Sequence, residues 1–393
     1  QLTLARLQLS ALQAEVQARQ LRIGLDEPSA QGQLQATVPG ATLQVDGQMA
    51  ARAGNGSLDL RLADAQRLQR WIESLPGLQS ALKGITLQGN AQLQTRWTGG
   101  WQDLQRQLHA AGLLAGPAPA ATGPAGRFDL QARLSTPRLQ ADLPPRPGGA
   151  TGPMTIELRD VRAELAGSVA QATLAWDGEV RQGGQRATLQ ARATAGTTAP
   201  GQWRAQIDKL KLLALLDQRP GPWTLQLTQP LSLTARLAPS LLVETSGGQA
   251  TVAGPKPGQA TLRWQPVRYA QTAQGAMQLR TQGELQGLPT AWADAFMADG
   301  EQALQRLGLG GNLILDGQWD VDAGETLRAR ASLHRVDGDL RVLAGELPPT
   351  TVVQSSGQGT AEGAPKAAAS APGTPAGVRQ AEVQIDAEGD AVR

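Results

Sequence analysis

Residue types that commonly carry out chemistry are scarce in this chain. It has two histidines, His109 and His334, and no cysteine. Neither histidine lies in a HExxH, GxSxG or phosphate-loop context, the short patterns that hold metal ligands, nucleophiles or phosphates. The string HRVDGDL at His334 is explained by a turn between two strands, because Asp-Gly supplies the positive φ that a hairpin requires. We therefore expect no catalytic residues and no enzymatic activity.

The acidic string DVDAGE is the best candidate for a metal site. Asp320, Asp322 and Glu325 would place three hard oxygen ligands at the close spacing of a calcium loop. A hairpin turn explains the same residues, and we favour the turn. The absence of cysteine excludes disulfides and thiolate metal sites. We expect no metal ion and no cofactor.

The charge is nearly balanced, with 36 basic and 34 acidic side chains and a net charge of +2. This balance does not predict a nucleic-acid partner. The arginines are interpreted as a solvated outer face. A chain without cysteine also fits a bacterial envelope protein that avoids stray oxidation.

The pattern that organises the chain is a period-two alternation over residues 85–97, ITLQGNAQLQTRW. Odd positions, such as Leu87, Leu93 and Trp97, are mostly apolar, and even positions are polar. The pattern predicts one strand with an apolar face and a polar face, because successive side chains of a strand point to opposite faces. At about 3.3 Å per residue the strand would run roughly 43 Å, twice the usual length. The pattern returns over residues 313–321, with Ile314 as the exception.

Aromatic residues are only 3% of the chain, so the apolar faces must be built mainly from Leu, Val and Ala. A transmembrane β-barrel normally carries aromatic girdles, and one Tyr with two Phe cannot form them. We therefore expect an aliphatic surface of another kind.

The predicted fold class is mainly β: an elongated, curled, antiparallel-rich sheet (a β-taco or open groove) with a hydrophobic interior and a few short amphipathic helices. Turn and linker compositions divide the chain into five parts. These are a groove segment over residues 1–111 with a helix near 64–75, Pro/Gly-rich loops around a strand over 112–153, a groove segment over 154–343 with helices near 208–217 and 289–307, a low-complexity loop over 344–377, and a further strand in 378–393.

Two local patterns have competing interpretations. Residues 101–112 suit either a helix face or an alternating strand, and we favour a strand. Four Asp-Gly pairs indicate hairpin turns. They are Asp46-Gly47, Asp177-Gly178, Asp316-Gly317 and Asp337-Gly338, of which Asp316-Gly317 also fits a bulge inside a strand.

A unit of helix followed by a long strand ending in tryptophan occurs twice. Trp71 precedes Trp97 by 26 residues, and Trp292 precedes Trp319 by 27. Repeated units that stack side by side build a continuous apolar surface. We interpret the chain as such a repeat.

The apolar stripes have two possible roles, which the sequence leaves open. They could pack against a second sheet as an ordinary sandwich core, or they could line an open groove that holds aliphatic chains of a ligand. The candidate groove-lining residues are Leu87, Leu93, Trp97, Leu174, Trp176, Leu225, Leu227, Leu313, Leu315, Trp319, Leu327 and Leu333.

Several strings carry a family resemblance: LQGNAQLQTRWTGGW, ATLAWDGEV, GQATLRWQP and LILDGQWDVDAGETLRARASLHRVDGDLRV. They resemble the central part of TamB-like translocation and assembly proteins and the part that leads toward their C-terminus. These proteins belong to the broader AsmA-like group. The resemblance implies a chain in the periplasm of a Gram-negative bacterium whose sheet curls into a long hydrophobic trough. It also implies a parent chain anchored in the inner membrane and a TamA-like outer-membrane β-barrel as an assembly partner.

Together these features predict a conduit that carries phospholipid toward the outer membrane and supports assembly of outer-membrane proteins. The alternative is a structural β-scaffold that binds client or partner strands along its edges. The chain begins and ends within sequence that has the alternating pattern of a strand, and it has no run of eighteen apolar residues. We therefore interpret it as an internal fragment of a longer protein.

Overall fold

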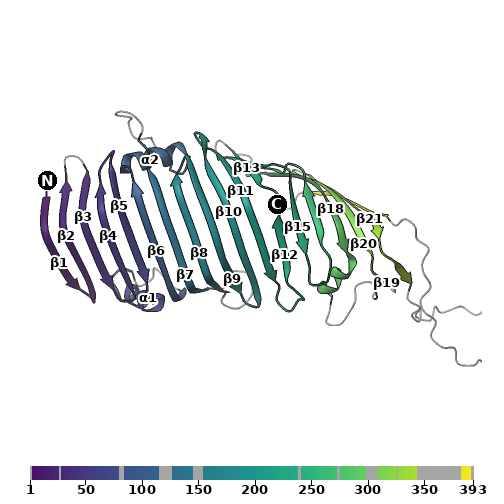
Figure 1. Cartoon of the computed structure of the whole chain (residues 1–393), viewed down its shortest axis with the longest axis horizontal. Coiled ribbons are helices and arrows are strands. Elements are labelled where there is room, and N and C mark those ends of the chain that lie inside the picture. Colours follow the sequence, from purple (N-terminus) through teal and green to yellow (C-terminus); the bar gives the residue numbers. More distant parts are fainter. Residues whose placement is uncertain are drawn as a thin grey trace, which may run out of the picture.

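The structure, a computed structural model, is one large antiparallel sheet of 21 strands that curls without closing into a barrel (Figure 1). It describes residues 2–25, 28–78, 84–114, 126–144, 154–237, 240–271, 275–297, 305, 309–324, 326–342 and 382–390. The predicted fold class is confirmed. The predicted low-complexity loop over 344–377 lies outside the described residues.

The first half of the sheet is a simple meander in which each strand pairs with the next along the chain. Its strands are β1 (Leu2–Ala11), β2 (Ala14–Gly24), β3 (Ser29–Val38), β4 (Ala41–Met49), β5 (Gly54–Leu62), β6 (Thr86–Thr98), β7 (Asp129–Leu143), β8 (Met154–Ser168), β9 (Gln171–Gln182), β10 (Gln185–Ala199) and β11 (Gln202–Leu215). The long strand predicted at 85–97 is therefore confirmed as β6.

The second half begins with short strands that lie end to end in pairs. They are β12 (Trp223–Leu227), β13 (Leu231–Arg236), β14 (Leu241–Thr245), β15 (Gly248–Ala253), β16 (Ala260–Trp264) and β17 (Arg268–Gln271). The long strands β18 (Met277–Pro289), β20 (Ile314–Ala323), β21 (Thr326–Asp337) and β23 (Glu382–Asp390) complete the sheet. A separate pair is formed by β19 (Leu309–Gly311) and β22 (Leu340–Val342).

Helix α1 (Ala65–Ser74) confirms the helix predicted near 64–75. The Asp64 side chain caps its first turn by accepting a hydrogen bond from the Arg67 N–H at 2.9 Å. Helix α2 (Trp101–Ala110) contradicts the strand that we favoured over 101–112. Leu104 and Leu108 are spaced i, i+4 and suit both structures, and the acidic Asp103 in the first turn is the signal that favours a helix.

The helices predicted near 208–217 and 289–307 are not found as predicted. The helix predicted near 208–217 is wrong, because this segment lies in β11 and pairs with β10 on one side and with β12 and β13 on the other. The error has a plain cause: short apolar runs do not distinguish a helix from a strand. The predicted helix over 289–307 is reduced to the 3-10 helix η1 (Thr290–Phe296), and most of 298–308 lies outside the described residues.

Two of the four Asp-Gly turns are also wrong, because Asp46-Gly47 lies inside β4 and Asp177-Gly178 inside β9. These glycines serve close approach between strands instead: a Cβ on Gly47 would lie 2.5 Å from the Gly56 Cα. Asp316-Gly317 lies inside β20, and the Asp316 carboxylate accepts a hydrogen bond at 2.7 Å from the Gly287 N–H of the bulge in β18. Only Asp337-Gly338 ends a strand.

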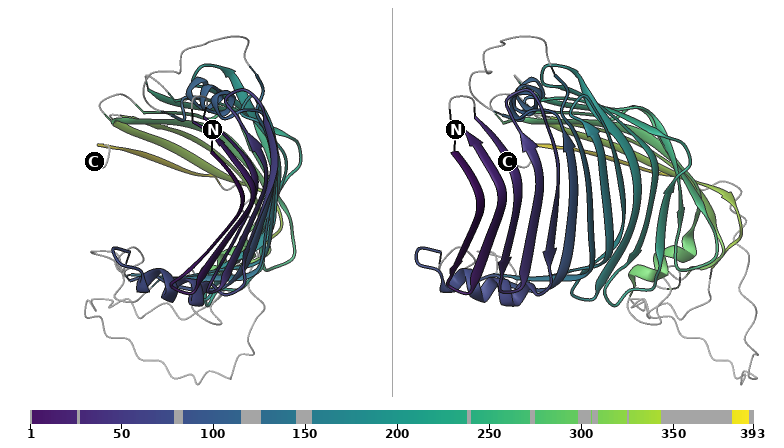
Figure 2. Two further views of the ribbon diagram at one scale, coloured as in Figure 1. Left: turned by 90° about the vertical axis from the view of Figure 1, so that its left-hand side faces the viewer. Right: turned by 60° about the vertical axis from the view of Figure 1, so that its left-hand side comes forward.

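Bulges bend several of the long strands. Register shifts occur in the β2–β3, β6–β7, β8–β9 and β18–β20 pairs. An extra residue on one strand of a pair kinks that strand and increases its twist. The strands consequently bow, and the view along the sheet in Figure 2 shows a C-shaped profile with α1 at one end of the strands and α2 at the other.

The Pro/Gly-rich region contains a strand, as predicted for 112–153, and this strand is β7. Parts of its loops, residues 115–125 and 145–153, lie outside the described residues. The strand predicted in 378–393 is β23, and the acidic string at 320–325 begins in β20, with Glu325 outside the described residues.

Candidate functional site

One face of the sheet, here called the apolar face, carries continuous ladders of uncharged and, except for Thr95, apolar residues that are paired directly from strand to strand. The first ladder crosses β1 to β11 and consists of Leu9, Val16, Ala36, Leu43, Leu60, Leu93, Leu134, Ala163, Trp176, Ala191 and Leu210. The second crosses β1 to β13 and consists of Leu7, Ala18, Leu34, Val45, Leu58, Thr95, Ala132, Leu165, Leu174, Ala193, Ile207 and Leu231. Neither ladder contains a charged side chain.

The opposite face, here called the outer face, is polar in the same register. Its ladder through β1 to β8 consists of Gln8, Gln17, Gln35, Gln44, Asp59, Gln94, Arg133 and Glu164. The alternation read from β6 therefore extends sideways across the sheet. Strand pairing converts a one-dimensional pattern into two chemically distinct surfaces.

The apolar face has no second layer of strands over it in the described part of the chain. Apart from β6, which also contacts α1, each strand makes its extensive contacts with its hydrogen-bonded neighbours. Leu60, Leu165, Leu174 and Leu333 keep 36%, 38%, 46% and 37% of their surface exposed. A sandwich core would bury such leucines almost completely. For the described residues, the structure therefore matches the open face and not the sandwich core.

The apolar face lies on the inner side of the bowed strands. Thr136 and Val161 sit opposite each other on this face beside the bulges of β7 and β8, and they are 2% and 1% exposed without any covering layer. Along β6, Leu87 and Leu93 are partly buried, whereas the similarly sized Gln88 and Gln94 are exposed. Side chains crowd together on the concave side of a bend and spread apart on the convex side. The curled sheet thus presents its apolar residues inward.

Eleven of the twelve predicted groove-lining residues lie on the apolar face. They are Leu87, Leu93 and Trp97 in β6, Leu174 and Trp176 in β9, Leu225 and Leu227 in β12, Leu315 and Trp319 in β20, and Leu327 and Leu333 in β21. Leu313 is different. It precedes β20, is 8% exposed, and its carbonyl accepts hydrogen bonds at 3.0 Å from the backbone N–H and the hydroxyl of Thr290. It joins η1 to β20 and is not part of the open surface.

Tryptophans on this face lie across glycines of the preceding strand. A Cβ on Gly56 would lie 2.3 Å from the ring of Trp97, and a Cβ on Gly283 would lie 2.2 Å from the ring of Trp319. The strand part of the predicted repeat therefore has the same packing in both copies. The helix part differs, because Trp71 lies in the α-helix α1 and Trp292 in the 3-10 helix η1.

A third tryptophan with this packing was missed by the sequence reasoning. Trp264 covers Gly248, and the directly paired residues of β15, β16, β18, β20 and β21 are Gly248, Trp264, Gly283, Trp319 and Ala331. The string GQATLRW was visible in the sequence, but the register that aligns its tryptophan with glycines on both neighbouring strands was not. The indole rings cover the backbone of these glycines, which have no side chain to shield it from solvent.

Helix α1 braces one end of the strands. The buried Gln69 side chain donates to the Ile85 carbonyl at 2.6 Å and accepts from the Leu87 N–H at 2.7 Å, which ties the helix to the start of β6. The Trp71 indole N–H donates to the Leu12 carbonyl at 2.7 Å in the β1–β2 turn. The helix therefore links the β1–β2 turn to the start of β6 and leaves the middle of the apolar face open.

Helix α2 braces the other end over a longer stretch. The Trp101 indole N–H donates to the Pro28 carbonyl at 3.2 Å, before β3. The Ala110 and Ala111 carbonyls accept from the Gly201 N–H at 2.9 Å and from the Trp203 indole at 3.0 Å, at the start of β11. One short helix thus connects the turn after β2 to the turn before β11.

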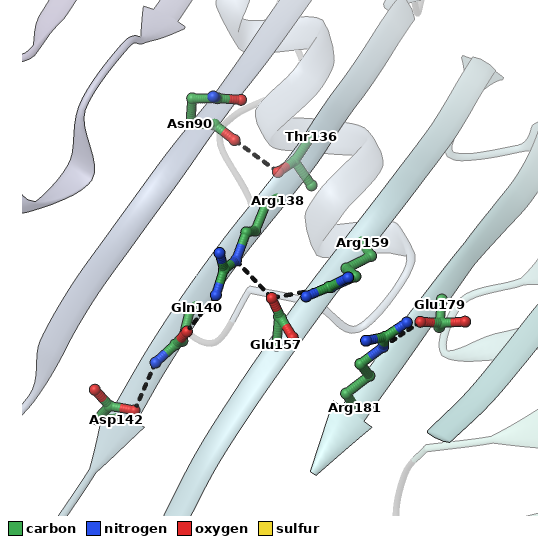
Figure 3. Close-up of polar contacts among 9 residues, drawn as sticks. All are labelled: Asn90, Thr136, Arg138, Gln140, Asp142, Glu157, Arg159, Glu179 and Arg181. Carbon is green, nitrogen blue, oxygen red and sulfur yellow. Dashed lines mark hydrogen bonds and ion pairs between the residues drawn. The ribbon is translucent and has the colours of Figure 1, made fainter. Parts of the chain in front are cut away.

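The outer face carries ion pairs that cross strands (Figure 3). Glu157 in β8 pairs with Arg159 at 3.0 Å and with Arg138 of β7, and Glu179 in β9 pairs with Arg181 and with Arg186 of β10. Burial alone would raise the pKa of Glu157, but the two guanidinium groups outweigh burial and lower that pKa. These pairs hold neighbouring strands together on the side away from the apolar face.

Two depressions on the outer face are polar. A cavity of about 610 Å³ is lined mainly by glutamine, arginine and aspartate of β2 to β7, and a second of about 640 Å³ lies over β16, β18, β20 and β21. Asp59, at the first cavity, has a pKa that burial would raise but that hydrogen bonds from Arg61, Gln94 and Gln92 lower. Neither cavity contains a histidine.

The residues that could do metal or acid–base chemistry are dispersed. His109 lies in α2 and His334 in β21, while Asp320 and Asp322 lie in β20 and Glu325 is outside the described residues. Within the described ranges no cluster of three or more His, Cys, Asp or Glu residues could hold a metal ion. No helix in those ranges is long and apolar enough to cross a membrane.

No family model, curated protein or solved structure matches this chain. The function is therefore inferred from the surfaces of the molecule. The resemblance to TamB-like proteins remains an expectation from sequence strings.

Proposed function

We propose that this chain is a lipid conduit: phospholipid acyl chains lie on the apolar face, and the polar head groups stay in water beyond the ends of the strands. One observation carries the proposal, namely that the two apolar ladders are continuous, uncharged and uncovered across more than ten strands. A chain that exposes so long an apolar surface to water needs something apolar to cover it.

The size of the surface supports a lipid ligand. At about 4.8 Å per strand and about 6.6 Å between alternate residues, the two ladders cover roughly 650 Å² over a length of about 50 Å. Contiguous exposed apolar patches of monomeric proteins rarely exceed a few hundred Å². Flexible aliphatic chains can follow a curved surface of this shape.

The energetics support transport more than storage. Burial of two sixteen-carbon tails from water stabilises a lipid by on the order of 20 kcal/mol, at about 0.8 kcal/mol per CH₂. A lipid that leaves a bilayer loses nearly the same amount, so transfer from bilayer to protein is close to isoenergetic. The ladders contain no charged group that would trap a head group at one position, which favours sliding along the sheet.

The cellular setting of the proposal comes from the sequence resemblance alone. A TamB-like chain would act in the periplasm of a Gram-negative bacterium, as part of a parent protein held in the inner membrane. It would work with a TamA-like outer-membrane barrel and support the assembly of outer-membrane proteins. We propose the same setting here, with no enzymatic activity, cofactor or nucleic-acid partner.

Lipid analysis of the purified protein tests the proposal. The protein is purified in buffer without detergent and extracted with organic solvent, and the extract is analysed by mass spectrometry. We expect phospholipid at one or more molecules per chain. Protein that is folded by circular dichroism but carries no phospholipid, and takes none up from vesicles, would contradict the conduit.

A second candidate, a scaffold that binds client strands, is favoured by the edge of the sheet. Strand β1 pairs only with β2 among the described residues, so its other edge offers backbone donors and acceptors to another strand. Hydrogen exchange tests this candidate. A peptide with alternating apolar and polar residues should protect the amides of β1 and leave those of β6 unchanged; uniform or absent protection would exclude edge binding.

A further inference from the structure

Three neighbouring long strands are each interrupted near their midpoints. The interruptions lie at residues 228–230 between β12 and β13, at 246–247 between β14 and β15, and at 265–267 between β16 and β17. Because the three strands are adjacent, the interruptions line up across the sheet. We call this line the seam.

The seam keeps some backbone hydrogen bonds, from the N–H groups of Thr228, Ser246 and Gln265 to the carbonyls of Gln249, Ser232 and Gln282 at 3.0, 2.8 and 2.9 Å, but two of its residues cannot donate. Pro230 and Pro266 have no N–H and cannot donate to a neighbouring strand. Side chains replace part of the ladder: the Ser232 N–H donates to the Ser246 hydroxyl at 3.1 Å, and the Val267 N–H donates to the Thr245 hydroxyl at 3.3 Å. Proline removes two backbone donors from this line and each of the three strands is interrupted there, so we expect bending to be easier along it than within an uninterrupted strand.

Strand β11, which borders the seam on one side, is also irregular where the seam meets it. In β11, Ile207 pairs with β13 and Lys211 pairs with β12, and the residues between them pair with neither strand. The register of β11 against β10 shifts at the same place, beside Asp208. On the other flank β18 runs through without interruption, so the seam extends from β11 to β18 and ends there.

The seam separates two small walls with separate anchors. The first wall, β12, β15 and β16, is held by η1, because Trp223 packs against Trp292 at 5.6 Å and against Phe296 at 5.4 Å between ring centroids. The second wall, β13, β14 and β17, continues toward α2, with the Leu237 N–H donating to the Gly201 carbonyl at 3.0 Å.

We propose that the seam is a hinge that changes the opening of the curled sheet between β11 and β18. The seam crosses the strands at mid-length, so rotation about it alters the angle between the two walls and hence the width of the apolar surface between them. The inference rests on the proposed lipid function for its purpose, because a conduit must widen and narrow as acyl chains pass. Strands β1 to β10 contain no comparable line of interruptions and are braced by α1 and α2.

Distance distributions between spin labels test the hinge. The chain has no native cysteine, so introduced cysteines are labelled selectively. One pair, Gln226→Cys and Thr234→Cys, is exposed on either side of the seam, and eight residues separate the two positions, about 26 Å at 3.3 Å per residue. The matched control, Gln88→Cys and Arg96→Cys, has the same separation on the uninterrupted strand β6, and both positions are exposed.

We expect a broader distribution for the seam pair than for the β6 pair in pulsed electron double resonance. A bend of about 45° between two collinear arms of about 13 Å shortens the distance by about 2 Å, so added phospholipid should move the seam pair by about this amount and leave the control in place. Replacement of both seam prolines, Pro230→Thr with Pro266→Thr, should narrow the seam distribution.

The outcomes separate the hinge from the proposed function. Equal widths for the two pairs overturn the hinge, whether or not the protein carries lipid. A broad seam distribution in protein that takes up no lipid supports the hinge and contradicts the conduit. A broad distribution that bound phospholipid does not shift overturns the inference that the hinge serves lipid passage.

Discussion

Replacement of Leu93 by arginine should remove lipid binding and leave the sheet folded. Leu93 is on the first ladder, paired directly with Leu60 and Leu134, and its side chain is only partly buried. No second layer covers it, so an arginine at this position can extend into solvent when no lipid is present. The fold should therefore lose less than about 1 kcal/mol, the range of ordinary surface substitutions.

The effect on a lipid should be much larger. An arginine facing hydrocarbon costs about 2.5 to 3.5 kcal/mol on membrane-insertion scales, which corresponds to an affinity loss on the order of 100-fold for a lipid whose tails cover residue 93. Lipid occupancy is measured by native mass spectrometry after incubation with vesicles, and folding is measured by circular dichroism during thermal unfolding.

The matched control is Gln94→Arg, which adds the same side chain on the neighbouring residue but on the outer face. It should keep normal lipid occupancy. Equal loss of lipid in both variants would refute the assignment of the apolar face. Unfolding of Leu93→Arg alone would mean that Leu93 is covered by protein, as in a sandwich core.

Three further predictions concern the packing that supports the face. Gly283→Ala should destabilise the sheet by about 1 to 3 kcal/mol in urea unfolding, because the new Cβ would lie 2.2 Å from the Trp319 ring and 2.4 Å from a backbone carbonyl. Gln69→Ala should cost about 1 to 3 kcal/mol, because it leaves two backbone groups beside β6 without their hydrogen-bond partner. The carboxylate of Glu157 has a lowered pKa in the folded state, so its contribution is fully present above the ordinary glutamate pKa of about 4.3 and is lost as the pH falls through the folded value; Glu157→Gln should flatten this acid-side slope.

Each of these predictions has its own control. Gly324→Ala should be nearly neutral, since the nearest atom to its new Cβ is a side-chain carbon at 3.8 Å. Gln66→Ala, on an exposed position of α1, should not destabilise the protein. The pH prediction would be contradicted by identical acid unfolding curves for the wild-type protein and Glu157→Gln.

The fold was predictable where alternation is long. Over residues 85–97 the pattern identified β6 to within one residue at each end, and the helix predicted near 64–75 corresponds to α1. Shorter segments failed, because apolar residues in 101–112 and 208–217 fit both helix and strand. Pairing with β10 decides for a strand over 208–217, whereas over 101–112 the acidic Asp103 in the first turn favours the helix.

The candidate site was predictable as a set of residues but not as a surface. Periodicity places Leu93 and Trp97 on one face of a strand, yet it cannot reveal whether another layer covers that face. The alternation of Gly248, Trp264, Gly283 and Trp319 depends on the registers of three strand pairs, which no local pattern specifies. The same holds for the seam, whose prolines are visible as strand breakers but whose alignment is not.

The most direct measurement of the central claim is a photo-crosslinking scan along β6. A photoreactive amino acid is placed singly at Leu87, Gln88, Leu93, Gln94, Arg96 and Trp97, and lipid adducts are counted by mass spectrometry after illumination in the presence of phospholipid vesicles. The lipid conduit predicts adducts at Leu87, Leu93 and Trp97, and none above background at Gln88, Gln94 and Arg96. Adducts without this alternation, or only protein–protein crosslinks at the apolar positions, would contradict it.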